Sequence, residues 1–337
     1  MKTGIILANT GSPEGPEPDQ VEAYLRQFLM DPRICQLPRP LWKYVVFHHI
    51  LPKRKYTSSE RYKRIWRAEG SPLINDQEKL AEKVQLLFDA QGRSRDSADP
   101  VDVRIGMSYG TPSLEEVLST FKDNGYDRVV LLPTYPQSAF SPTQAVIDAY
   151  RRALDSLEYR PKSVVIDNYH DNAHYISAVA DAIRDAGYRP EEGDRLMLSM
   201  HSIPLKDKRA GDTYVEQTTE SFALIACELG IDRDDITMSF QSVFGHDPSK
   251  WQGPLSLDVL AQWREEGFDG RVVFMCPGFA IDCLETLYDI PYEMCPAFAG
   301  SENTPDKTDR FVWVKTLGPT DRHATIMKEV VDAALGE

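Results

Sequence analysis

The stretch RVVFMCPGFAIDCLETLYD, residues 271–289, is the part of the sequence that most clearly indicates the fold. Its apolar run Val272–Met275 has the character of a buried strand. Pro277 and Gly278 end that run, and a segment of helical character follows. A strand, a turn and a helix in this order are the repeating unit of parallel α/β sheets. The stretch therefore predicts an α/β protein.

Three acidic residues lie in the helical part of this stretch. Asp282, Glu285 and Asp289 stand at i, i+3 and i+7, so on a helix they share one face. The residues between them are apolar enough to bury the segment, and a buried acid is costly unless it is paired, hydrogen-bonded or bound to a cation. The acids predict either a cation site or the solvated face of an amphipathic helix.

Strands and helices alternate along the rest of the chain, and the series starts again near residue 160. We expect two similar Rossmann-like α/β domains, residues 1–158 and 159–337, each with a parallel sheet flanked by helices, and an active-site cleft between them. The last helix is expected to pack on the N-terminal half. The expected strands are 4–9, 103–107, 128–133, 162–167, 195–200, 236–241 and 271–275, and the expected helices are 20–30, 76–91, 113–124, 141–157, 173–186, 213–229, 256–266 and 320–335.

One insertion, residues 31–70, interrupts this alternation and is called the lip below. It shows no clean period, is rich in bulky apolar residues such as Leu37 and Trp42, and carries ten Lys or Arg against three acids. A basic, apolar insertion in an acidic protein suggests a lid over a flat hydrophobic ligand with anionic groups, or contact with a membrane surface. The alternative is an irregular subdomain packed on its own core.

Composition narrows the class of protein. The 337 residues are 42% hydrophobic and 27% charged, and the net charge of −14 argues against general nucleic-acid binding. No apolar run reaches the ~18 residues that span a bilayer, and the N-terminus turns polar too soon for a signal peptide. The five cysteines are odd in number and form no C-x-x-C, which favours a reducing cytoplasm over a disulfide framework.

Polar, small or aromatic residues follow the expected strands, where ligands of open α/β sheets bind. They begin at Thr10, Ser108, Thr134, His201, residues 241–246 and Cys276. His201 stands at the end of an apolar strand, with the acids of residues 282–289 after another strand of the same half. An imidazole near carboxylates can move protons at neutral pH, although a lone histidine is often structural.

Other site classes lack their sequence patterns. Neither G-x-G-x-x-G nor G-x-x-x-x-G-K-[ST] occurs, which argues against a nucleotide site. No C-x-x-C marks a closed zinc site, and Ser202 directly follows His201 and does not stand on a nucleophile elbow. Cys276, Cys283 and Cys295 fit no simple cluster spacing, so an iron–sulfur centre is not expected.

The chain resembles the ferrochelatases, which insert ferrous iron into a porphyrin to make haem. The motifs that carry the resemblance lie in the family's order, and the pair His-Ser-x-Pro and Asp-x-Leu-Glu-Thr-Leu is highly specific in combination. They occupy residues 8–14, 24–29, 70–73, 106–110, 135–137, 201–204, 240–242 and 276–287.

The resemblance implies chelatase-type domains, a lyase that forms metal–nitrogen bonds, and roles for individual residues. His201 would accept pyrrole protons or bind iron early, with Glu285 as its partner across the pocket. Asp282, Glu285 and Asp289 would conduct iron in or protons out. Porphyrin contacts would come from Thr10, Arg54, Tyr62, Ser71, Tyr109, Trp251 and Phe279.

The resemblance also implies substrates and partners. Fe²⁺ would be a substrate, no cofactor would be tightly bound, and the porphyrin would be protoporphyrin IX or coproporphyrin III. Other haem-pathway enzymes and a membrane surface at the lip are further expected partners of a cytoplasmic protein peripheral to the inner membrane face. Nucleic acid is not expected to bind.

Two departures from the family pattern matter. Some members have histidine where this chain has Cys283, and some have a cysteine after Tyr-Pro-Gln where it has Ser138, so a [2Fe–2S] cluster is not expected. Two alternatives stay open: a chelatase that loads cobalt or nickel into an earlier tetrapyrrole, and a non-enzymatic tetrapyrrole or metal carrier. The lip argues against the first, because those relatives are typically shorter and lack it.

Overall fold

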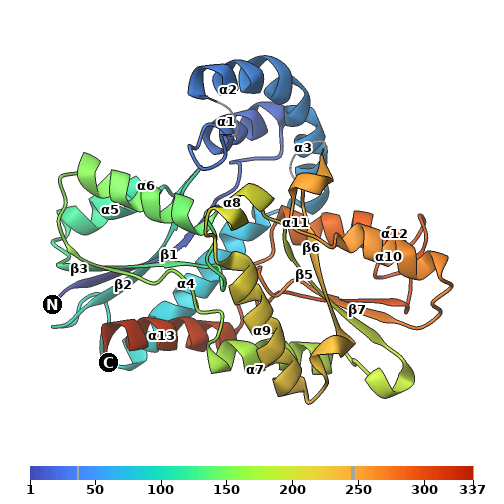
Figure 1. The fold of residues 1–337 in the computed structure, drawn as a ribbon. Helices are drawn as coiled ribbons and strands as arrows, with labels where there is room; N and C mark the ends of the chain where they lie inside the picture. The colour runs from blue at the N-terminus through green and yellow to red at the C-terminus, as the bar shows by residue number, and fades with distance from the viewer. Residues whose placement is uncertain (36–37, 244–246, 337) are drawn as a thin grey trace. The chain divides into compact units, whose positions relative to one another are not determined.

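The computed structural model describes residues 1–35, 38–243 and 247–336. Within them the chain forms two compact units (Figure 1). Unit 1 comprises residues 1–134, 138–168 and 319–337, and unit 2 comprises residues 135–137 and 169–318. Leu37 of the lip and residues 244–246, which end one of the polar strand-end segments, lie outside the described residues.

Unit 1 is built on a parallel sheet with the strand order β2-β1-β3-β4 in the part of the chain that the structure describes. The central strands β1 and β3 are buried throughout, because helices cover both faces of the sheet. In the register of this sheet, Leu7 lies opposite Ile105 on one side and Leu132 on the other. The strands are β1 (Thr3–Asn9), β2 (Val101–Met107), β3 (Arg128–Pro133) and β4 (Lys162–Val165).

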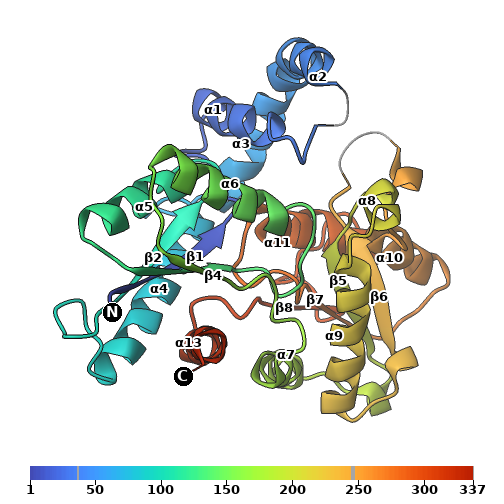
Figure 2. The same cartoon turned by 60° about the vertical axis from the view of Figure 1, so that its left-hand side comes forward.

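Helices α4 (Pro72–Ala90) and α13 (Asp321–Leu335) pack together on one face of this sheet, and α5 (Leu114–Asp123) and α6 (Thr143–Ser156) lie on the other face (Figures 1 and 2). α4 also holds the strands by polar contacts. The amide of Gln77 donates to the Leu7 carbonyl over 2.9 Å, and the Gln85 side chain pairs with the backbone of β2 at Val101 and Val103. The buried Gln85 carboxamide thus forms hydrogen bonds with backbone groups at the outer edge of β2.

The lip is helical from Arg39 to Ile65. α2 (Arg39–Val45), the π-helical turn η1 (Val46–Ile50) and α3 (Leu51–Ile65) follow one another directly, and α3 packs on α1 (Pro18–Leu29). Trp42 is 3% exposed, and its Nε1 donates to the Leu29 carbonyl over 2.6 Å. The π turn inserts an extra residue into the helix and shifts its apolar face. That shift explains why the sequence shows no clean period here.

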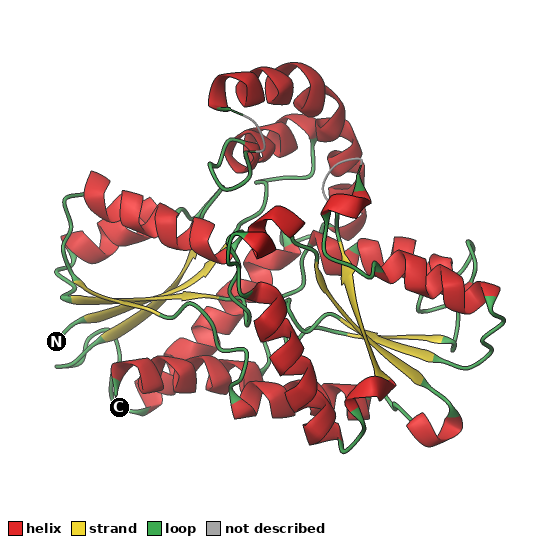
Figure 3. Cartoon of the chain, in the orientation of Figure 1, coloured by secondary structure: helices red, strands yellow, loops and turns green. Residues whose placement is uncertain are grey.

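Unit 2 repeats the plan with the strand order β6-β5-β7-β8 among its described residues, and in both units helices surround the strands (Figure 3). Phe274 and Phe311 stack across β7 and β8 at 5.4 Å between ring centroids. Its strands are β5 (Arg195–His201), β6 (Ile236–Gln241), β7 (Val272–Met275) and β8 (Phe311–Val314), and its longer helices are α7 (Ala173–Asp185), α9 (Tyr214–Leu229) and α10 (Ser256–Glu265). Its short helical segments are α8 (Leu205–Arg209), α11 (Leu284–Leu287), α12 (Cys295–Ala299), η2 (Pro190–Glu192), η3 (Arg233–Asp235), η4 (Pro248–Lys250) and η5 (Ile290–Met294).

The segment after β7 differs from the single helix expected for it. α11 covers only Leu284–Leu287, and a π-helical turn, η5, follows before α12. Cys283 is extended, with φ −137° and ψ −169°, so Asp282 stands in the loop before the helix. The expectation that three acids share one helical face is therefore wrong. Their positions are set by a loop, a short helix and the junction with η5.

The sequence boundary between the two units lies later than the expected one at 158/159. Residues 162–165, expected to open the second half, form β4 and pair with β3, so the change of unit falls after Asn168. The last helix, α13, belongs to unit 1, where it packs on α4. None of the described helices is both long and apolar enough to cross a bilayer.

Candidate active site

His201 is the last residue of β5, the strand that pairs with both β6 and β7. Its Nδ1 lies 2.7 Å from the Ser202 carbonyl oxygen. A carbonyl can only accept a hydrogen bond, so Nδ1 carries the proton and the neutral ring keeps its lone pair on Nε2. This tautomer gives the half-buried imidazole one nitrogen able to accept a proton or bind a metal ion.

Two aromatic residues lie on segments beside the histidine. The Phe279 and His201 rings are 6.4 Å apart between centroids and tilted by 51°. Trp251 forms a bridge with Pro204, and the neighbouring Gln252 carbonyl accepts from the Ser202 hydroxyl over 2.8 Å. Both of these predicted site residues therefore belong to segments that contact His201 or the loop that follows it.

Asp282 lies in the loop before α11 and Glu285 lies within α11, and Thr286 fixes the turn between them. The buried Thr286 hydroxyl donates to Asp282 Oδ1 over 2.8 Å and accepts from the Cys283 amide over 3.0 Å. Burial, with the Glu285 carboxylate beside it, holds the pKa of the Cys283 thiol well above its ordinary value. The thiol therefore stays protonated next to Glu285 at neutral pH.

Asp289 is a buried acid, 6% exposed, and is held from the end of β6. The Ser242 hydroxyl donates to Asp289 Oδ2 over 3.0 Å. Ser242 has φ +64°, a left-handed conformation that is uncommon for residues other than glycine. Such strain at a strand end often accompanies a functional site. Burial excludes the solvated-face alternative for Asp289.

Unit 1 gathers Thr10, Ser71 and Tyr109 around the ends of β1 and β2. The Tyr109 amide donates to the Thr10 carbonyl over 3.0 Å. The Ser71 hydroxyl donates to Ser12 Oγ over 2.8 Å, which joins the start of α4 to the loop after β1. The Tyr109 ring lies edge-on to Phe28 at 5.6 Å. These predicted residues thus form one group in unit 1.

Tyr62 and Arg54 lie on α3 within the lip. The Tyr62 ring is 9% exposed and stands edge-on to Trp66 at 6.0 Å, whereas Arg54 is half-buried. One turn of helix is about 5.4 Å, so the eight positions between them place Tyr62 roughly two turns beyond Arg54. A carboxylate held at Arg54 would therefore sit well away from a ring packed at Tyr62.

The described acids and thiols do not gather into a metal-binding cluster. Within residues 1–35, 38–243 and 247–336, no three His, Cys, Asp or Glu side chains are arranged to hold a metal ion. Burial raises the pKa of Cys276 well above its ordinary value, with Asp282 and Asp289 adding to the effect, and burial raises the pKa of Cys295 to about 12. These thiols are protonated at neutral pH, whereas a metal ligand must be a thiolate.

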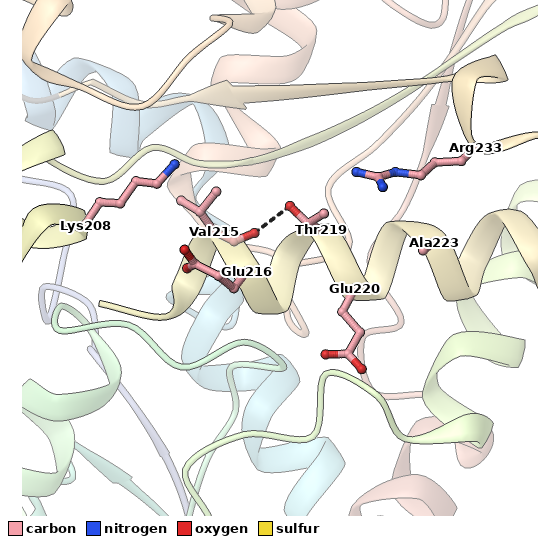
Figure 4. Close-up of a pocket in the computed structure, with 7 residues that line it drawn as sticks. All are labelled: Lys208, Val215, Glu216, Thr219, Glu220, Ala223 and Arg233. Carbon is pink, nitrogen blue, oxygen red and sulfur yellow. Dashed lines mark hydrogen bonds between the residues drawn. The ribbon is translucent and has the colours of Figure 1, made fainter. Parts of the chain in front are cut away.

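A separate open pocket of about 520 Å³ lies along α9 (Figure 4). Val215, Thr219 and Ala223 give it a floor of small residues. Lys208 and Arg233 lie at its edges, as the close-up shows, and Glu216 and Glu220 complete the lining. None of the predicted site residues lines this pocket.

Two residues at the end of β6, both outside the predicted site set, contact its acids. Ser242 bonds the Asp289 carboxylate, and Gln241 donates to the Glu285 carbonyl over 3.0 Å. Gln241 ends β6 and Ser242 follows it, so the strand-end pattern marks the segment. The pattern does not reveal their contacts, because these depend on how the segments after β6 and β7 fold together.

Comparisons with known proteins identify the family that this sequence matches. A family model described as Ferrochelatase matches residues 2–335. A protein named Ferrochelatase from Nitrosococcus oceani is 33% identical over 98% of this chain and 86% of its own length, and one from Escherichia coli O139:H28 is 34% identical over 98% of each chain.

A likeness to solved structures concerns the fold. SirB from Bacillus subtilis with Fe³⁺ matches with a TM-score of 0.56 and 11% identity, covering 99% of this chain and 96% of that one. The sirohydrochlorin chelatase SirB in complex with cobalt matches with a TM-score of 0.52. At this identity the likeness supports two Rossmann-like units and says nothing of the substrate. The family model and the named relatives, which span nearly the whole sequence, show that the chain belongs to the ferrochelatase family.

Proposed function

We propose that this chain inserts Fe²⁺ into a porphyrin and releases two protons, as a lyase that forms metal–nitrogen bonds in haem synthesis. Family membership over residues 2–335 supports the reaction and does not favour the cobalt or nickel alternative. The observation that carries the proposal is the His201 tautomer. Its proton on Nδ1 is engaged by the Ser202 carbonyl, which leaves Nε2 as a base.

The proton balance of the reaction fits these residues. A free-base porphyrin has two N–H protons, and each must leave as an Fe–N bond forms, with no change in the oxidation state of the iron. His201 Nε2 would accept a pyrrole proton, since the unprotonated nitrogen of an imidazole is a base. The carboxylates of Glu285, Asp282 and Asp289 would attract Fe²⁺ and pass protons onward.

Each unit carries residues that we propose for porphyrin contact. They are Thr10, Ser71 and Tyr109 in unit 1, and the aromatic residues Trp251 and Phe279 in unit 2. On the lip, Tyr62 would contact the macrocycle edge and Arg54 would pair with a propionate, because guanidinium matches a carboxylate well. In this proposal iron is a substrate, and no cofactor is tightly bound.

The experiment is anaerobic Fe²⁺ insertion into protoporphyrin IX and coproporphyrin III, followed by the Soret band. We expect His201→Ala to lower kcat by about 10²–10⁴-fold, the usual value of a general base. His174→Ala, which changes an exposed histidine of α7 in the same unit, should keep wild-type turnover. The preferred porphyrin will identify the substrate.

Two outcomes would contradict this proposal. Wild-type protein that binds porphyrin without turnover would leave the carrier alternative standing. Equal turnover by His201→Ala and wild type would remove His201 from the chemistry and leave the reaction to other residues.

A second part of the proposal concerns the lip, which we propose touches an anionic membrane surface while the protein stays peripheral on the cytoplasmic side. Leu41 and Tyr44 of α2 are 51% and 56% exposed, and Tyr56 of α3 is 57% exposed. Lys43 lies between the first two in sequence. Exposed apolar residues interleaved with cations are typical of interfacial helices.

A further inference from the structure

The Gln241 side chain is buried beside residues of the candidate site of unit 2. It is 2% exposed and ends β6, and it contacts residues of three other segments. Its Oε1 accepts from the Ser199 hydroxyl of β5 over 2.8 Å and from the Cys276 thiol after β7 over 3.2 Å. Its Nε2 donates to the Glu285 carbonyl over 3.0 Å.

Chemistry fixes the orientation of this carboxamide. The Glu285 carbonyl can only accept, so the NH₂ group must face it. The oxygen then faces Ser199 and Cys276, both of which can donate. The Cys276 thiol is available as a donor because burial raises its pKa well above the ordinary value. All three contacts are therefore satisfied together, and a flipped amide would lose the bond to Glu285.

A buried chain of hydroxyls supports the oxygen side. Ser199 Oγ lies 2.7 Å from Ser256 Oγ, and the Ser256 hydroxyl lies 2.9 Å from Ser239 Oγ. All three serines are 0% exposed. A satisfied buried network of this kind has one low-energy arrangement, since an unpaired buried polar group is costly. It holds Gln241 against β5 and the start of α10.

The other side of Gln241 contacts the first turn of a helical segment. α11, Leu284–Leu287, is about one helical turn, and η5 and α12 follow it. The first turn of a helix frays more easily than its interior, so contacts from other elements help to fix it. The bond from Gln241 comes from another element, β6, and it acts on the residue that carries the Glu285 carboxylate.

We propose that Gln241 is a positioning residue for Glu285: it transmits the rigidity of the β5–β6 strand ends to the backbone of α11. The role in turnover rests on the proposed function, whereas the effect on α11 does not. A carboxylate that moves iron or protons must be held in place, because a shift of about 1 Å can cost about 10²-fold in rate.

The test compares Gln241→Met, which keeps the volume and removes the carboxamide, with Ser256→Ala. The serine variant disturbs the same buried network and leaves the bond between Gln241 and Glu285 in place. Hydrogen–deuterium exchange is measured on peptides covering residues 283–289. We expect exchange about tenfold faster in Gln241→Met, the equivalent of one lost hydrogen bond, and unchanged in Ser256→Ala.

Turnover is measured on the same proteins with Fe²⁺ and the preferred porphyrin. We expect Gln241→Met to lower kcat by about 10–100-fold with porphyrin KM within about twofold, because positioning acts on the chemical step. Gln217→Met, an α9 glutamine outside the network, should match wild type.

Each other result overturns a stated part of the inference. Unchanged exchange at 283–289 in Gln241→Met shows that the bond does not hold α11. Equal acceleration in Ser256→Ala assigns the effect to general loosening of the core. Faster exchange with normal kcat removes the role in turnover. A wild type without iron insertion defeats the proposed function, and exchange still decides whether Gln241 holds α11.

Discussion

At position 11 the loops after β1 and β2 approach so closely that a side chain has no room. Gly11 has φ +106°, and a Cβ atom there would lie 1.9 Å from the Tyr109 carbonyl oxygen. Gly110 repeats the arrangement from the other loop, since its Cβ would lie 2.6 Å from the Ser12 carbonyl. The backbone contact of these loops sets the place of Tyr109.

We expect Gly11→Ala to destabilise unit 1 by about 2–5 kcal/mol, the sum of a left-handed alanine and a displaced loop. Gly92→Ala is the matched control, because Gly92 also has a positive φ of +76° and its Cβ would meet nothing within 4 Å. Its cost is about 1–2 kcal/mol. Thermal unfolding by calorimetry checks both, and equal losses of stability would show that the approach to Tyr109 is easily relieved.

Individual residues differ in how far the sequence alone could place them. The position of His201 at the end of a strand was predictable, because an apolar run visibly ends there. The partners of Gln241 were not predictable, since they come from β5, the segment after β7 and α11. The bond between Ser242 and Asp289 also depends on a positive φ that no sequence pattern marks.

At the scale of elements, the lip combines a buried anchor with an exposed face. Trp42 is buried and bonded to the Leu29 carbonyl, while its neighbours Leu41 and Tyr44 are more than half exposed. The anchor fixes which side of α2 points outward. When a lipid interface covers exposed apolar groups on a fixed helix, the free energy of the system falls.

We expect the double variant Leu41→Ser and Tyr44→Ser to reduce flotation with phosphatidylserine-containing liposomes several-fold, because it removes the exposed apolar groups. Leu86→Ser changes a 64% exposed leucine of α4 and should float like wild type. Added salt should weaken flotation through screening of the lip cations. Wild type that stays unbound, or a double variant that floats normally, would rule out this contact.

Elements were predicted best where one period runs without a break. The long amphipathic helices α6, α7, α9 and α13 match their expected ranges closely. The lip and the segment after β7 were not resolved by periodicity, since each contains a π-helical turn, η1 or η5, that shifts the apolar face. The edge strand β8 was also missed, because the surrounding residues carry little pattern.

At the scale of the whole molecule, buried tyrosines and cysteines with raised pKa values determine how stability changes at alkaline pH. Burial raises the pKa of Tyr169, Tyr175 and Tyr214 above the ordinary 10.0, and that of Cys276 and Cys283 above 9.0. The unfolded chain therefore loses these protons before the folded protein does. Their stabilisation is complete below the ordinary pKa and is lost as the pH rises through the raised values.

We expect the urea midpoint of unit 2 to fall steadily as the pH rises above about 9, with unfolding accompanied by tyrosinate absorbance. Tyr175→Phe, which cannot ionise, should make this fall shallower. The same substitution removes the bond to the Pro277 carbonyl, so the slope with pH is compared and not the midpoint itself. A midpoint that does not change up to about pH 11 would contradict the expectation.

Unit 1 is interrupted in sequence by unit 2, and α13 returns at residues 321–335 to cover α4. A chain leaving the ribosome from its N-terminus has therefore finished unit 2 before the last helix of unit 1 exists. Until then the part of α4 that packs on α13 has no cover, although α4 can already pack on β2. Synthesis thus completes the C-terminal unit first, the reverse of the usual order of domain maturation.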